Sequence, residues 1–214
     1  MKIAVNNQPG RVRSQVNKPA LIVRKRESPG PTAGGDRRVR RTQQALIQAL
    51  VDLVLAKRYD AITIQNLLDR ADVGRSTFYA HYRGKDDLLL QSFLGMLELL
   101  DQVLDRDDPD SRRVAPVKEL FAHIGEFRSF QQALSRAHVL ERQYQVGATH
   151  VSRTIERRLA AFPQAAGAPA VPRAVRAQAL AGAMFALLRW WIDHDAPYTP
   201  EQMDAMFHAI AANG

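Results

Sequence analysis

Residues 63–89 constrain the fold of this chain more than any other segment, because their pattern matches two short helices joined by a tight turn. The first helix is predicted to start after Thr63, a residue type that commonly caps a helix N-terminus. Its apolar residues then recur three and four positions apart, which is the spacing of one helix face. These residues are Ile64, Leu67, Leu68 and Ala71. We therefore predict a short helix that buries one face.

A turn and a second short helix follow directly. The turn is predicted at Asp72–Gly74, where Val73 supplies one apolar residue for the angle between the helices. The second helix is predicted from Arg75 to Tyr82, with Phe78 and Tyr82 on its buried face. Its other face carries hydrogen-bonding side chains and no carboxylate: Arg75, Ser76, Thr77, Tyr79 and His81. A narrow helix of this kind fits the DNA major groove, so the segment predicts a DNA-binding helix-turn-helix.

The same residues resemble the DNA-binding domain of TetR-type transcriptional repressors. The shared pattern is T-x-x-x-L-x-x-x-A-x-V-x-x-x-T-F-Y-x-H-Y-x-x-K-x-x-L-L, in which T-F-Y-x-H-Y followed by the lysine is the specific part. It matches at Thr63, Leu67, Ala71, Val73, Thr77, Phe78, Tyr79, His81, Tyr82, Lys85, Leu88 and Leu89. The chain departs from the pattern at Asp72, where the family usually has glycine, and at Gly74, where Ser or Thr usually caps the recognition helix. Asp tolerates left-handed backbone angles, and Gly is a weaker N-cap.

The resemblance and the side chains together predict the DNA contacts. We expect Arg75, Thr77 and Tyr79 to recognise the operator, and His81 and Lys85 to contact phosphates. The alternative for Lys85 is a solvated lysine in the first turn of a helix. The full predicted set is Thr63, Gln65, Gly74, Arg75, Ser76, Thr77, Tyr79, His81, Lys85, Arg38 and Arg41.

The positive charge of the chain lies almost entirely at its beginning. The net charge is +8, yet residues 1–41 alone carry 11 Lys and Arg against two acidic residues. Residues 1–36 are interrupted by Pro and Gly and hold few apolar residues, so we expect a disordered basic arm. Two interpretations of the arm remain open, an idle tail and a segment that lies along DNA phosphates or in the minor groove. The arginine cluster before the first helix, residues 37–41, is the better candidate for a phosphate contact.

Helical spacing continues through the rest of the chain, and no segment alternates with the period of a strand, so we predict an all-α fold. A first helix from Arg38 to Lys57 would complete a three-helix DNA-binding domain over residues 37–86. A larger helical regulatory and dimerisation domain is predicted over residues 87–214. Its helices are expected at 88–104, 114–127, 129–162, 173–194 and 200–212, with a break in the third near Ser135–His138 or at Gly147.

The helix from 173 to 194 is apolar nearly all round, which predicts burial on several faces. The resemblance implies that the last two helices pair with those of a second subunit. The alternative is that this surface packs entirely within one chain. The predicted interface residues are Ala181, Gly182, Phe185, Met203 and Phe207.

Aromatic and polar-tipped residues on otherwise apolar helices predict, chiefly through the resemblance, a pocket for a small molecule. The predicted lining residues are His123, Phe127, Phe130, His138, Tyr144 and Trp190, with Gln131 and Gln143 in the same helices. The chain is therefore interpreted as a repressor that binds a palindromic double-stranded DNA operator as a homodimer and is released by an unidentified small-molecule effector. The alternative is a constitutive DNA-binding or architectural protein that senses no ligand.

Other classes of protein are disfavoured by what the chain contains. With no Cys, disulfides and zinc ribbons are excluded. The six His show no pairing at helical spacing, and no phosphate loop or nucleophile elbow is present, so we expect neither an enzyme, a metal nor a cofactor. No stretch approaches the length of a membrane span or resembles a signal peptide, which predicts a cytoplasmic protein with no membrane partner.

Overall fold

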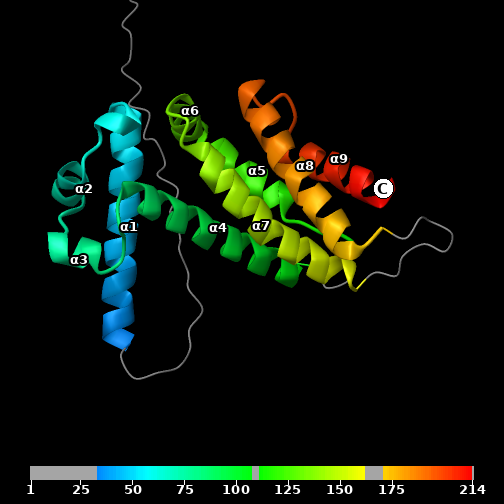
Figure 1. Ribbon diagram of the computed structural model, residues 1–214, viewed down its shortest axis with the longest axis horizontal. Coiled ribbons are helices and arrows are strands. Elements are labelled where there is room, and N and C mark those ends of the chain that lie inside the picture. Colours follow the sequence, from blue (N-terminus) through cyan, green and yellow to red (C-terminus); the bar gives the residue numbers. More distant parts are fainter. Residues whose placement is uncertain (1–32, 108–110, 162–170, 214) are drawn as a thin grey trace, which may run out of the picture.

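The computed structural model describes residues 33–107, 111–161 and 171–213, and all regular structure in these ranges is helical (Figure 1). The elements are α1 (Ala33–Ala56), the 3-10 turn η1 (Tyr59–Ala61), α2 (Ile64–Ala71), α3 (Arg75–Tyr79), α4 (Lys85–Asp107), α5 (Val117–Glu126), α6 (Arg128–Arg136), α7 (Leu140–Leu159), α8 (Arg173–Asp193) and α9 (Pro200–Asn213). The predicted all-α fold is confirmed. None of the helices in these ranges is long and apolar enough to cross a membrane.

The beginning of α1 differs from the prediction. Residues 33–36, assigned by the sequence to the basic arm, form the first turn of α1, so the helix starts five residues before Arg38. The run of Arg and Gln that follows favours helix and extends it toward the N-terminus. Residues 1–32, which make up the rest of the predicted arm, lie outside the described part of the chain.

The helices form two groups that α4 connects. In Figure 1, α1, α2 and α3 lie at one end of the molecule, and α4 leads from them into a bundle of α5 to α9. Within this bundle α7 packs against α8 and α4, and α5 packs against α9. The predicted recognition helix α3 and the last two helices therefore lie at opposite ends of the molecule.

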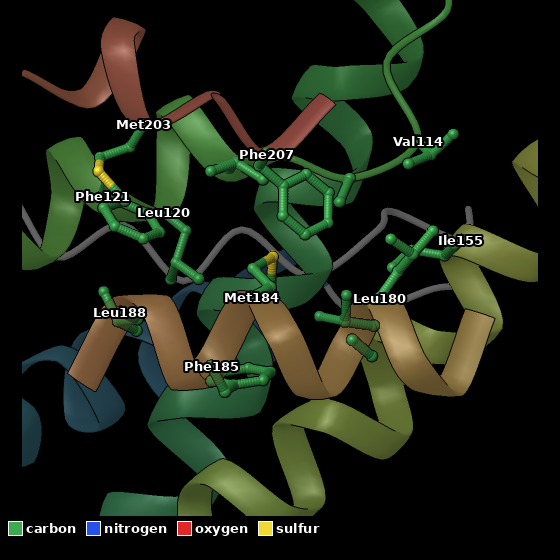
Figure 2. Close-up of a cluster of buried hydrophobic side chains, with 14 of the residues drawn as sticks. Val114, Leu120, Phe121, Ile155, Leu180, Met184, Phe185, Leu188, Met203 and Phe207 are labelled. Carbon is green, nitrogen blue, oxygen red and sulfur yellow. The ribbon is translucent and has the colours of Figure 1, made fainter. Parts of the chain in front are cut away.

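The core of the bundle is built around α8, which is buried on two sides. Figure 2 shows Leu180, Met184 and Leu188 projecting from one side of α8 toward Phe207 and its neighbours. Phe185 projects toward α4 and α7, where its ring lies 6.3 Å from that of Phe93 and 5.7 Å from that of Tyr144. Burial on two sides accounts for the nearly uniform apolar sequence of this helix.

Gly147 lies inside α7, where the sequence allowed a helix break. The break is instead at residues 137–139, between α6 and α7, and His138 takes the left-handed conformation there with φ 57°. A Cβ on Gly147 would lie 2.7 Å from ring carbons of both Phe93 and Phe185. Glycine is therefore needed at this position because α4 and α8 approach α7 closely.

The DNA-binding end has its own apolar core, but helices of the bundle contribute to it. The cluster is formed by α1, α2, α3 and the start of α4, and it also includes Phe130 and Leu134 of α6 and Leu140 of α7. The helix α1 packs against α4 and α6 as well as α2. The two groups of helices thus share one packed core. Because packed side chains transmit strain, a displacement of α6 would also move α1.

A half-buried ionic network attaches the segment that precedes α5 to the last helix, α9. The guanidinium of Arg113 pairs with Glu119 through bonds of 2.9 and 2.6 Å and with Asp204 at 2.8 Å. The backbone N–H of Lys118 also donates to Asp204, at 3.0 Å. Burial alone would raise the pKa of Asp204, but hydrogen bonds from His208 and Arg113 outweigh burial and lower this pKa to about 2.

Candidate DNA-binding surface and effector cavity

The first helix of the helix-turn-helix is held at both ends by local bonds. At its start, the Asn66 N–H donates to Thr63 Oγ1 and the Thr63 N–H donates to Asn66 Oδ1, both at 3.1 Å, so Thr63 caps α2 as predicted. At its end, Asp72 adopts the left-handed conformation with φ 53°, which Asp tolerates. The Val73 N–H donates to the Leu68 carbonyl at 3.1 Å and closes the turn.

The recognition helix is shorter than predicted. It ends at Tyr79 rather than Tyr82, and Gly74 precedes it without a side-chain cap. Phe78 is fully buried and Tyr82 nearly so, which confirms the predicted buried face. Tyr79, in contrast, is 50% exposed and lies at the outer side of the helix.

The predicted DNA contacts fall on the exposed surface, with Lys85 as the exception. The exposed ones are Thr63, Gln65, Gly74, Arg75, Ser76, Thr77, Tyr79, His81, Arg38 and Arg41. Arg75 is already oriented, because its Nη2 donates to Gln65 Oε1 at 3.0 Å and Gln65 Nε2 donates to Asp69 at 2.7 Å. A guanidinium has five N–H donors, so this bond leaves Arg75 able to contact a base.

Lys85 is half-buried and holds two elements together. Its ammonium donates to the carbonyls of Tyr59 at 2.8 Å and Ile62 at 2.9 Å, and it lies 4.5 Å from the centre of the Tyr59 ring. The hydroxyl of Tyr59 donates in turn to Asp86, and burial followed by this bond raises the pKa of Tyr59. Lys85 therefore joins η1 to the start of α4, and it is not the freely solvated lysine of the alternative interpretation.

A cavity of about 70 Å³ lies between α1 and the bundle. It brings together most of the predicted pocket residues, namely His123, Phe127, Phe130, Gln131, Gln143 and Tyr144. The sequence did not predict the wall formed by Ile47, Leu50 and Val51 of α1. These three belong to an ordinary apolar helix face, and no sequence signal separates a cavity wall from the rest of such a face.

Two predicted pocket residues lie elsewhere. His138 is exposed in the break between α6 and α7, where its backbone reverses the chain. Trp190 is 39% exposed, and its ring stacks with His194 at 4.9 Å and Tyr198 at 6.2 Å. Its neighbour Trp191 points into the core, and adjacent helical residues point to different sides, so Trp190 faces outward.

The predicted interface residues are also placed differently. Four of the five, Ala181, Phe185, Met203 and Phe207, are buried in the core of a single chain, and Gly182 alone of the five is exposed. Ala181 and Phe185 of α8 and Met203 and Phe207 of α9 belong to one core cluster together with residues of α5 and α7 (Figure 2). A different apolar stripe is exposed on α8 and α9: Val175, Ala179, Gly182, Ala186, Trp190, Met206 and Ile210.

Part of the chain matches known proteins. Residues 46–91 match the family model described as "Bacterial regulatory proteins, tetR family". An uncharacterised HTH-type transcriptional regulator YxbF of Bacillus subtilis is 31% identical over 119 residues, which are 54% of this chain and 30% of that protein. The HTH-type transcriptional regulator TcmR of Streptomyces glaucescens is 28% identical over 81 residues, which are 35% of this chain and 36% of that protein. The chain thus spans about a third of the length of the curated relatives it matches.

Solved structures resemble most of the fold. The dihydroxyacetone kinase operon activator DhaS superposes with a TM-score of 0.59 at 16% identity, over 80% of this chain and 94% of that one. A putative TetR-family regulator from Syntrophomonas wolfei superposes with a TM-score of 0.56 at 19% identity, over 80% of this chain and 93% of that one.

The exposed recognition helix on a capped scaffold, joined to a helical bundle, defines a two-part helix-turn-helix protein of the DNA-binding class. Residues 46–91 match the DNA-binding segment of the tetR family of bacterial regulatory proteins, and this match with the shared fold supports a TetR-type transcriptional regulator. The comparisons point to a regulator rather than to an enzyme.

Proposed function

We propose that this protein is a repressor that binds a palindromic operator as a homodimer and leaves it when a small-molecule effector fills the cavity. The observation that carries the proposal is the position of α1. This helix packs against α2 of the helix-turn-helix, while its residues Ile47, Leu50 and Val51 line the cavity. A ligand in the cavity would therefore press on the helix that supports the DNA-reading segment.

In the proposed complex the recognition helix α3 enters the major groove. Arg75, Thr77 and Tyr79 contact base edges, and His81 contacts a phosphate. The remaining exposed polar residues of the predicted set, Thr63, Gln65, Gly74, Ser76, Arg38 and Arg41, contact the backbone on either side. All of these are exposed in the free protein, and α3 carries no carboxylate that would repel phosphate.

Lys85 is proposed to combine a structural role with a phosphate contact. An ammonium has three N–H donors, and two of them are bonded to the carbonyls of Tyr59 and Ile62. The third is available for a phosphate oxygen. A lysine fixed in this way loses little side-chain entropy when it binds DNA.

The proposed dimer forms through the exposed stripe of α8 and α9, which includes Gly182 but not the four buried residues that the sequence indicated. Small residues such as Ala179, Gly182 and Ala186 allow a second α8 to approach closely, and Trp190 and Ile210 supply apolar area at the edges. Because α3 lies at the other end of the molecule, the dimer presents two recognition helices to DNA. Two half-sites read in this way lie about 34–36 Å apart, or a multiple of that spacing.

The two sites are coupled through α1 and α4. A ligand that separates α1 from α6 alters the spacing of the two recognition helices, and a coupling of about 1–3 kcal/mol is enough to change operator occupancy several-fold. The small volume of the cavity, about 70 Å³, favours the alternative of a constitutive binder that senses no ligand. The ligand-responsive repressor and the constitutive binder differ in whether any small molecule lowers the affinity for the operator.

The test of DNA recognition is selection of bound duplexes from a random library by the purified protein. We expect an enriched palindrome. Arg75→Ala should bind it about 1–3 kcal/mol more weakly and lose base preference at one position of each half-site. The exposed Arg153→Ala on α7 serves as the control and should bind like the wild type. Unchanged affinity and preference in Arg75→Ala would show that α3 does not read the operator.

The test of the dimer compares neighbouring residues of α8. A Cβ at Gly182 meets nothing within 4 Å, so Gly182→Trp should fold and yet sediment as a monomer, because the indole blocks the partner helix. Ala181 is fully buried, so Ala181→Trp should instead lower the stability of the fold. A wild-type protein that is monomeric at micromolar concentration, or a Gly182→Trp protein that remains dimeric, would contradict the proposed interface.

A further inference from the structure

One of the residues that line the cavity has a buried polar atom without a hydrogen bond. Gln143 of α7 is only 5% exposed, and its Oε1 accepts no hydrogen bond from the described residues. Among the described residues, three other buried polar atoms also lack a partner, and they belong to Asp101, Arg128 and Arg176, none of which lines the cavity. Buried polar groups in native proteins are nearly always paired, so an unpaired one in a cavity wall marks the place of a missing donor.

The wall carries no formal charge at neutral pH. Among the described residues, no Asp, Glu, Lys or Arg lines it. Burial lowers the pKa of His123, which keeps this imidazole neutral, and burial raises the pKa of Tyr144 to about 12. A charged ligand would lose its hydration without gaining an ionic partner here. The cavity therefore selects an uncharged molecule.

The wall also carries aromatic rings among its aliphatic side chains. The rings of Phe93, Phe127, Phe130 and Tyr144 line the space. Such rings pack well against a flat ring in edge-to-face or offset geometry. The volume of about 70 Å³ is roughly half that of an engineered cavity of about 150 Å³ that holds benzene. One ring is thus the largest group that a modest outward movement of the wall can admit, and part of that wall is α1.

We infer that the cavity binds an uncharged single-ring aromatic molecule with one hydroxyl or N–H group, which donates its hydrogen bond to Oε1 of Gln143. This rests on the proposed function in so far as such a molecule is the effector. Gln143 acts as the specificity-determining residue: it rejects an apolar ring of equal size, because that ring would leave its oxygen unpaired. The apolar walls supply most of the binding energy and the amide oxygen supplies the selectivity.

The experiment measures binding of three probes to the full chain without DNA, by calorimetry. Phenol supplies a ring and a donor, toluene has a similar shape without the donor, and benzoate adds a charge. We expect phenol to bind about three- to tenfold more tightly than toluene, the range for one net hydrogen bond, and benzoate not to bind. Phenol and toluene of equal affinity would overturn the inference. So would no binding of either, which would mean that the cavity holds water only.

Substitutions assign the selectivity to one atom. Gln143→Leu and Gln143→Met remove the acceptor at similar volume, and each should abolish or reverse the preference for phenol while toluene still binds. Two replacements of different shape are used so that a folding defect in one leaves the other to test the assignment. The exposed Gln145→Leu on the same helix is the matched control and should keep the wild-type preference. A phenol preference that survives in folded Gln143→Met would overturn the assignment.

The probes also separate this inference from the proposed function. Operator binding is measured with and without phenol, using the palindrome enriched by selection. If phenol binds with the expected selectivity and operator affinity does not change, the cavity chemistry stands and the effector role fails. If another compound releases the operator while phenol does not bind, the effector role stands and this inference fails.

Discussion

Replacing Lys85 by alanine separates its structural role from its proposed contact with DNA. The substitution removes two hydrogen bonds, to the carbonyls of Tyr59 and Ile62, and the ammonium's contact with the Tyr59 ring. Hydrogen bonds from a charged group contribute about 1.5–3 kcal/mol each, and a cation–π contact about 0.5–1 kcal/mol at exposed sites. Lys85 is half-buried, so water reaches the freed carbonyls and the net effect falls well below the sum. We expect a loss of about 2 kcal/mol in the free energy of unfolding, on the scale of one charged hydrogen bond.

The assay is equilibrium unfolding in urea, with thermal unfolding as a second measurement. For a domain of this size, about 2 kcal/mol corresponds to a fall of roughly 4–8 °C in Tm. Arg83→Ala is the control, because Arg83 is exposed and lies two positions before Lys85. It should unfold within about 0.5 kcal/mol of the wild type. A Lys85→Ala protein as stable as this control would refute the structural argument.

The same variant then tests the phosphate contact. Under conditions where both proteins are folded, the slope of log affinity against log salt concentration should become shallower by about one unit in Lys85→Ala. Affinity should fall equally for the selected palindrome and for unrelated duplexes, because phosphates carry no base identity. An unchanged slope with lowered stability would leave Lys85 with its structural role only.

Two further predictions concern packing and pH. Gly147→Ala should lower the free energy of unfolding by about 1–3 kcal/mol, because the added Cβ would lie 2.7 Å from ring carbons of Phe93 and Phe185. Gly182→Ala is the matched control, compared at a protein concentration where all the proteins are monomeric. In the single chain a Cβ there meets no described atom within 4 Å, so this variant should gain up to about 1 kcal/mol. Equal effects of the two changes would contradict the packing argument. The pKa of Asp204 is lowered from 3.8 to about 2, so its contribution to stability is fully present above about pH 4 and is lost as the pH falls toward 2. Asp204→Asn should therefore lower the free energy of unfolding, measured in urea at pH 6, by about 2 kcal/mol relative to the wild type. This difference in free energy should shrink as the pH falls from 4 to 2. A difference independent of pH would show that the carboxylate charge is not what stabilises the network.

Local sequence was sufficient for the helix-turn-helix. The cap at Thr63, the left-handed turn at Asp72 and the buried position of Phe78 all depend on residues within a few positions of one another. The last helix is capped in the same way, because Thr199 and Gln202 exchange both reciprocal bonds. Short-range hydrogen bonds and helical spacing depend on neighbouring residues only, so they can be predicted without knowing what packs against them.

Side-chain direction on the buried helices was beyond local sequence. The pattern of α8 showed that it is apolar all round, yet it did not distinguish Ala181, which lies in the core, from Gly182, which faces open space. Trp190 and Trp191 are equally apolar, and the packing of Trp191 against Phe121 leaves Trp190 outside. A helix with apolar residues on every side has no preferred face until its neighbours are placed.

The residues that line the cavity were likewise predicted only in part from the sequence. The aromatic and amide residues of its wall were recognisable in the sequence as unusual members of apolar helices, and Gln143 was among them. That Ile47, Leu50 and Val51 of the DNA-binding end close the same cavity was decided by the packing of α1 against α4 and α6. Helical periodicity thus determined the elements, their caps and the recognition helix. The contact between the cavity and the DNA-binding end was decided by tertiary structure, because it joins residues about 40 to 95 positions apart whose proximity no local pattern encodes.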